Sequence, residues 1–209
     1  MNFHAALDIA QVVAILLFAV ICHEYAHGWV AYKLGDPTAK LAGRLTLNPL
    51  KHIDPVGSIV IPFLLKFLGL LPLGWAKPVP VNFERLRHPK RDMIWVAMAG
   101  PATNVALALL FSQLLRLSLP LFAIKICVLV VIINLILAIF NLVPIPPLDG
   151  SRIVMGLLPD RAVRQYSLLE PFGVFIVIVL LNFGLLDFVW IIVEFLAGQL
   201  GVMAASSQV

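Results

Sequence analysis

Charged side chains are scarce in this sequence of 209 residues. They make up 12% of the chain, whereas the hydrophobic class makes up 61%; a soluble domain normally has about 25% charged and about 45–50% apolar residues. The mean hydropathy of +1.01 agrees with this imbalance. The composition excludes a water-soluble globular protein.

Cysteine and histidine are also rare, with two and five residues. Two cysteines in apolar stretches are too few for a disulfide framework, and five histidines are too few for the ligand set of a membrane di-iron oxidase. The formal net charge of +4 is explained better by positive membrane loops than by a nucleic-acid surface. We therefore expect no nucleic-acid partner.

Long apolar runs dominate what is present. Four of them, over residues 9–22, 94–115, 121–143 and 172–200, are nearly free of charge, and a helix of about 20 apolar residues crosses a bilayer. We predict an all-α, multi-pass protein of the cell membrane, a bundle of about 4–6 membrane segments in lipid.

We expect one domain over residues 1–209, with a core over 5–158 and C-terminal membrane segments over 168–202. The last apolar run forms either one span or two short ones divided around residues 182–184.

The first apolar segment, about residues 7–34, carries the sequence H-E-Y-A-H at 23–27. On a helix, His23 and His27 lie one turn apart on one face and can bind one metal ion, while Glu24 reaches a water molecule at the metal and acts as a general base. The alternative is a structural polar face. Ionisable groups at membrane depth are costly and usually functional, which favours a metal site.

A catalytic zinc ion usually has three protein ligands and one open position. The best candidate for the third ligand is Asp149, which follows an apolar run and three prolines that break the helix, Pro144, Pro146 and Pro147. Irregular backbone at membrane depth is tolerated where it lines a cavity. The alternative, equally open at this point, is that Asp149 caps a short helix and pairs with Arg152.

The stretch over residues 56–71 decides the topology. If it crossed the membrane completely, Asp149 would lie on the opposite face from the two histidines. It contains Pro62 and Lys66 and is short for a span, so we expect a re-entrant hairpin, with an ordinary tilted helix as the alternative.

Positive charge supports the hairpin. With it, twelve of the fifteen Lys and Arg residues lie on one face, two on the other and one in the hairpin. The twelve are Lys33, Lys40, Arg44, Lys51, Lys77, Arg85, Arg87, Lys90, Arg91, Arg152, Arg161 and Arg164. Positive residues favour the cytoplasmic face, so we expect the N-terminus outside and the active site opening toward the cytoplasm.

The motifs resemble those of the site-2 protease family, intramembrane zinc metalloproteases that cut transmembrane segments of other proteins, and in particular its compact branch without PDZ or CBS domains. The matching stretches are H-E-Y-A-H at 23–27, N-P-L-K-H-I-D-P at 48–55, G-W-A-K-P-V-P-V-N at 74–82, A-G-P-A-T-N at 99–104 and N-L-V-P-I-P-P-L-D-G at 141–150. The resemblance implies one zinc ion per chain with Asp149 as a ligand, and single-pass membrane proteins or membrane peptides as substrates.

The resemblance also implies a substrate path. An unwound substrate strand would pair by β-augmentation with a β-strand loop of the re-entrant hairpin, between the first and second core helices. The loop residues are Trp75, Lys77, Pro78, Val79 and Pro80. Asn141 would hydrogen-bond the substrate backbone and Asn104 would support the site; for each, an interhelical hydrogen bond is the alternative.

Two alternatives remain. His52 is either an accessory metal ligand or a structural residue bonded to backbone. Besides the endopeptidase, the chain could be a catalytically silent relative that binds membrane segments, or a metal or proton carrier. Glu24 disfavours the silent binder, and a carrier would have ionisable residues along several spans.

Overall fold

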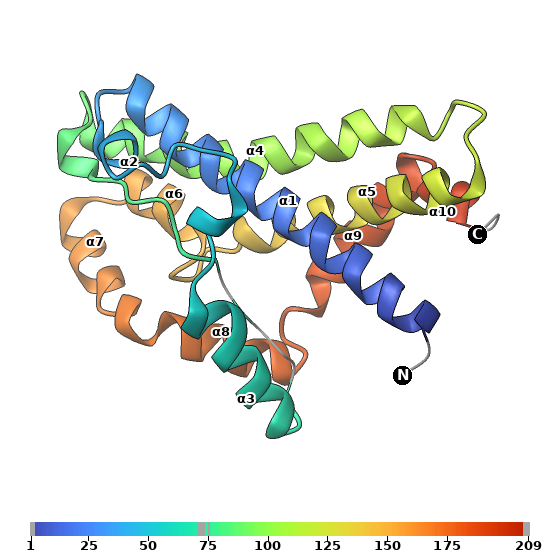
Figure 1. Cartoon of the computed structure of the whole chain (residues 1–209). Coiled ribbons are helices and arrows are strands. Elements are labelled where there is room, and N and C mark those ends of the chain that lie inside the picture. The colour runs from blue at the N-terminus through green and yellow to red at the C-terminus, as the bar shows by residue number, and fades with distance from the viewer. Residues whose placement is uncertain (1–2, 71–73, 75, 207–209) are drawn as a thin grey trace.

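The computed structural model describes residues 3–70, 74 and 76–206, and this part of the chain contains helices and no strand (Figure 1). Four helices in it are long and apolar enough to cross a membrane: Leu7–Lys33, Pro89–Leu114, Leu121–Asn141 and Asp160–Asn182. Many large apolar side chains on them are exposed, as lipid contact requires. The predicted all-α, multi-pass architecture is confirmed.

Three long helices form the centre of the molecule. They are α1 (Phe3–Lys33), α4 (Pro89–Leu114) and α5 (Leu121–Asn141). Figure 1 shows α4 and α5 running side by side while α1 crosses them, and α1 contacts both. A helix satisfies its own backbone hydrogen bonds, which lipid cannot do, so these apolar sequences form long uninterrupted helices.

The C-terminal half consists of shorter helices. They are α6 (Asp149–Leu157), α7 (Asp160–Ser167), α8 (Gly173–Asn182), α9 (Asp187–Gln199) and α10 (Val202–Ser206). Helix α6 packs on α4, whereas α9 and α10 pack on α5, around a core that includes Val131, Leu135 and Val193. Gly184, at φ +70°, lies between α8 and α9, so the last apolar run forms two helices.

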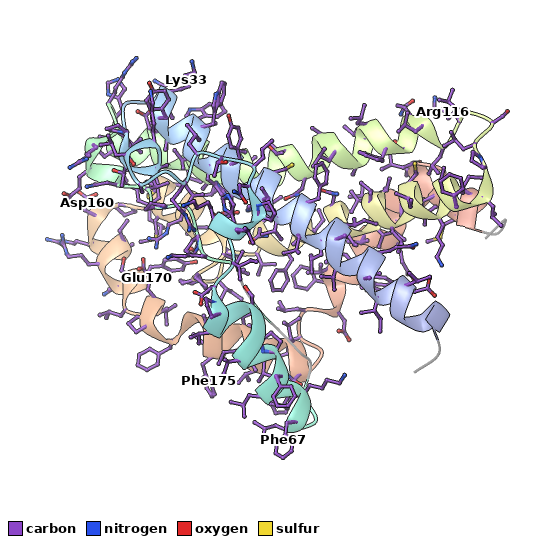
Figure 2. All side chains as sticks on the ribbon, in the orientation of Figure 1. Lys33, Phe67, Arg116, Asp160, Glu170 and Phe175 are labelled. Carbon is purple, nitrogen blue, oxygen red and sulfur yellow. The ribbon has the colours of Figure 1, made fainter. Side chains whose placement is uncertain are left out.

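The segment between α1 and α4 leaves the bundle and returns to it. After α2 (Thr38–Leu41) and a π-helical turn (Val56–Val60), α3 (Ile61–Phe67) projects outward, and Figure 2 shows Phe67 at its far end. The chain comes back so that the Lys77 N–H donates to the His52 carbonyl at 2.8 Å. This path out and back is the one that the predicted hairpin requires, and the entry of α3 into the membrane stays a prediction.

The returning residues 76–82 form no strand, contrary to the expected β-strand loop. The physical reason lies in their sequence and surroundings. Pro78 and Pro80 have no N–H to donate to a ladder, and no described segment lies beside them as a partner strand.

Labelled charged residues identify the two ends of the molecule. Figure 2 shows Lys33 and Asp160 at one end and Arg116 at the opposite end. At the first end the Lys90 Nζ lies 2.9 Å from Asp160 Oδ1 and joins the beginnings of α4 and α7. Figure 1 shows the C-terminal part of α1 and helix α6 toward this first end too, as a site shared by His23, His27 and Asp149 requires.

Candidate metal centre

Two histidines and an aspartate meet between α1 and α6. His23 and His27, one turn apart on α1, have ring centroids 4.6 Å apart and are buried. Asp149 is the first residue of α6, and its carboxylate oxygens lie 3.0 Å from His23 Nε2 and 3.2 Å from His27 Nε2. One side-chain atom from each residue lies within 4.8 Å of the others, a spacing that allows a common ion.

The opposite sides of both imidazoles face oxygen acceptors. His23 Nδ1 lies 2.5 Å from Asn104 Oδ1, and His27 Nδ1 lies 2.7 Å from the Val96 carbonyl oxygen. With these partners assigned, each neutral ring carries its proton on Nδ1, and the Nε2 lone pairs face the carboxylate.

The Nε2 lone pairs of the two histidines and the Asp149 carboxylate all carry negative charge density and have no proton between them. A cation bound among them would satisfy all three groups. Asp149 Oδ2 is buried and has no hydrogen-bond partner among the described residues. Neutral imidazole nitrogens whose other N–H is bonded to oxygen, together with a carboxylate, are a ligand set typical of catalytic zinc. The three residues present therefore fit zinc.

Gly100 of α4 lies directly against this cluster. A Cβ atom at this position would be 2.4 Å from His27 Nε2 and 2.5 Å from His23 Nε2, closer than any normal contact. The absence of a side chain at Gly100 therefore lets α4 and the two imidazoles approach each other this closely.

Asp149 does not pair with Arg152, the alternative that the sequence left open. Arg152 pairs with Glu170, at 2.8 Å between Nη1 and Oε1, and Asp149 faces the imidazoles instead. A Cβ on Gly150 would be 2.3 Å from the Leu142 carbonyl oxygen, so only glycine allows α6 to begin so close to the end of α5.

Glu24 is bonded to the returning loop. Its Oε2 accepts from the Val79 N–H at 2.7 Å. Gly28, one turn further along α1, makes this approach possible because a Cβ there would be 2.8 Å from Val79 Cγ1. The loop is held on either side: Arg44 donates to the Lys77 carbonyl at 2.7 Å, and Asp36 Oδ2 accepts from the Asn82 N–H at 2.7 Å.

The other residues singled out in the sequence lie around this centre. Pro78 and Pro80 are exposed beside buried Val79, and Trp75 lies outside the described residues. Asn141 donates to the Leu137 carbonyl of its own helix at 2.9 Å. His52 Nε2 lies 2.9 Å from the Thr46 carbonyl oxygen, and the described metal-ligand cluster does not include it.

Three residues of the site were not singled out from the sequence. Arg44 anchors the loop, Gly100 makes space beside the imidazoles, and Asn134 of α5 hydrogen-bonds Asn104, with 2.8 Å between Asn104 Nδ2 and Asn134 Oδ1. A signal for Asn134 exists, because a lone polar residue within an apolar span needs a polar partner. Gly100 belongs to the A-G-P-A-T-N stretch at 99–104, but this stretch does not indicate its contact with the imidazoles, and Arg44 has no local signal.

Comparison with known proteins agrees with this geometry. Residues 121–181 match peptidase family M50. The chain is 39% identical over 175 residues to the "Putative zinc metalloprotease YwhC" of Bacillus subtilis (strain 168), covering 79% of this chain and 77% of that protein. It is 32% identical over 174 residues to the "Putative zinc metalloprotease Rip2" of Mycolicibacterium smegmatis, covering 81% of this chain and 66% of that protein.

No solved structure matches the chain significantly. The similarity to YwhC extends over most of both proteins. The chain therefore belongs to peptidase family M50, the site-2 protease family, and is a metalloprotease.

Proposed function

We propose that the protein is an intramembrane endopeptidase that hydrolyses peptide bonds in or near the transmembrane segments of other membrane proteins, within one domain over residues 1–209. One zinc ion would be held by His23, His27 and Asp149. The observation that carries the proposal is the approach of the two Asp149 carboxylate oxygens, at 3.0 and 3.2 Å, to the imidazoles of His23 and His27 on the membrane helix that also holds Glu24.

Bound zinc would supply Lewis-acid chemistry, polarising a peptide carbonyl and lowering the pKa of water. The Glu24 carboxylate would accept the proton of the attacking water and deliver it to the leaving nitrogen. Asn104 and the Val96 carbonyl would hold the imidazole rings in position through their Nδ1 atoms.

The loop from Lys77 to Pro80 would bind the substrate, with Trp75 preceding it. A helical substrate hides its amides in backbone hydrogen bonds, so it must unwind before attack. The Val79 N–H now donates to Glu24, and a substrate carbonyl could take it instead. Asn141, at the end of α5, would donate to the substrate backbone.

The orientation follows from charge. The end that carries Lys33 and the beginning of α4 holds most positive residues under the hairpin topology. We expect it on the cytoplasmic face, which would leave the N-terminus outside and the zinc site open to the cytoplasm.

The test is zinc stoichiometry of the purified protein in detergent. The wild type should hold about one zinc per chain, and His23→Ala and Asp149→Ala should lose it. His88→Ala is the matched control, because His88 is exposed and lies in the connection before α4. Zinc retained without Asp149 would refute the ligand set.

Cleavage of a membrane-peptide substrate separates the endopeptidase from a silent binder. Glu24→Gln should keep zinc and lose cleavage. A wild type that binds zinc and membrane segments but cuts none would instead favour the catalytically silent relative.

A further inference from the structure

A chain of buried polar groups crosses three helices behind the candidate metal centre. It begins at His23 on α1, continues to Asn104 on α4 and Asn134 on α5, and ends at the Val130 carbonyl. The two asparagines are completely buried. Successive donor–acceptor distances from His23 are 2.5, 2.8 and 2.8 Å.

The last member gives the chain its direction. A backbone carbonyl can only accept, so the Val130 oxygen fixes the NH2 group of Asn134 toward itself at 2.8 Å. The Asn134 oxygen must then face Asn104 and accept from its Nδ2 atom. The Asn104 oxygen consequently faces His23.

We propose that Asn134 is a positioning residue that fixes the amide of Asn104 and thereby keeps the His23 proton on Nδ1. The inference rests on the proposed zinc site. Asn104 Nδ2 also lies 3.5 Å from the Ala19 carbonyl oxygen, a much longer contact than the 2.8 Å to Asn134 Oδ1. Without Asn134, only this long contact opposes rotation of the Asn104 amide by half a turn, which would present its NH2 group to His23. The imidazole would then have to accept at Nδ1 and carry its proton on Nε2, the atom that faces Asp149.

Zinc affinity of the purified protein, measured by competition with a chelator, tests this role. Asn134→Leu should lower the affinity about 10–100-fold, the usual effect of losing a residue that orients a metal-binding histidine. Asn134→Asp should keep most of it, because a neutral carboxyl group at this depth offers the same acceptor and donor. Ser112→Ala is the matched control, since Ser112 is buried in α4 and its hydroxyl bonds only groups of its own helix among described partners, the Leu109 carbonyl and Gln113 Nε2.

The Asn104→Asp background distinguishes orientation from packing. Both carboxylate oxygens of this variant can accept from His23, so its rotation no longer matters. Asn134→Leu should then cause little further loss of zinc affinity. An equal loss in both backgrounds would mean that Asn134 acts through packing, and would overturn the proposal.

The proposal also has a test that needs no variant. Nitrogen-15 NMR of the zinc-free wild type should show His23 protonated at Nδ1, and a bare Nδ1 would overturn the proposal even if the Asn134 variants fail to fold. A wild type that binds no zinc would refute the proposed function. Wild-type zinc binding with no loss in Asn134→Leu would refute only the role of Asn134.

Discussion

Replacing Gly100 with alanine should abolish zinc binding while leaving the fold intact. The added Cβ would lie 2.4 Å from His27 Nε2 and 2.5 Å from both Nε2 and Cε1 of His23, whereas ordinary contact begins at 3.4 Å. One or both rings would therefore have to move by about 1 Å. Metal–ligand distances tolerate only about 0.2 Å, so at least one imidazole would leave the ligand set.

The expected loss can be bounded from below. Removing a residue that merely orients a ligand costs about 10–100-fold in metal affinity, and displacing a ligand itself should cost about 100-fold or more, which is about 2.8 kcal/mol. Helix stability changes in the opposite direction, because alanine is favoured over glycine inside a helix by about 1 kcal/mol. The two effects can thus be measured separately.

The assay is zinc competition with a chelator, together with thermal unfolding of the zinc-free protein. Gly198→Ala is the matched control, because Gly198 lies in α9 and a Cβ there would meet no described atom within 4 Å. Zinc affinity in Gly100→Ala equal to that of the wild type would refute the close approach of α4 to the imidazoles.

Three further predictions address the base, the loop and the metal. Glu24→Gln should lower kcat about 10²–10⁴-fold with zinc still bound; a variant that cleaves normally would exclude Glu24 as the base. Arg44→Ala removes a charged donor from the Lys77 carbonyl, a hydrogen bond worth about 1.5–3 kcal/mol. Limited proteolysis within 77–82 should therefore accelerate, and the KM for substrate should rise. An unchanged digestion pattern would contradict this anchoring of the loop. Chelation should lower the Tm of the wild type, since a ligand at 1,000 times its Kd stabilises by about 4.1 kcal/mol; His23→Ala should show no such shift, and equal shifts would place the metal elsewhere.

The ligands of the candidate site are the part that sequence reasoning reached most directly. His23 and His27 are four residues apart, so the helix alone puts them on one face. Asp149 required more, namely a resemblance and the argument that both helix ends lie toward one membrane face. The structure brings all three together, and the chain returns at Lys77 to the His52 carbonyl, as the hairpin topology requires.

The loop was predicted in path but not in secondary structure. The family resemblance implies a β-strand loop, and Pro78 and Pro80 do favour extended backbone. The same prolines remove two of the N–H groups that a ladder needs, and the hydrogen bonds of the loop go instead to side chains such as Glu24 and Arg44. An extended backbone and pairing with a neighbouring strand are separate properties. The prolines indicate only the extended backbone.

Gly100 belongs to the A-G-P-A-T-N stretch at 99–104, but neither its role nor that of Asn134 follows from the sequence. Each acts through another helix: Gly100 by approaching α1, and Asn134 by orienting Asn104 across the boundary between α4 and α5. Such contacts depend on how far one helix is shifted and rotated along another, and residue spacing within a helix contains no information about that shift. The metal-binding atoms can therefore be found from local motifs, whereas the space beside them and the proton on His23 Nδ1 depend on packing among three helices.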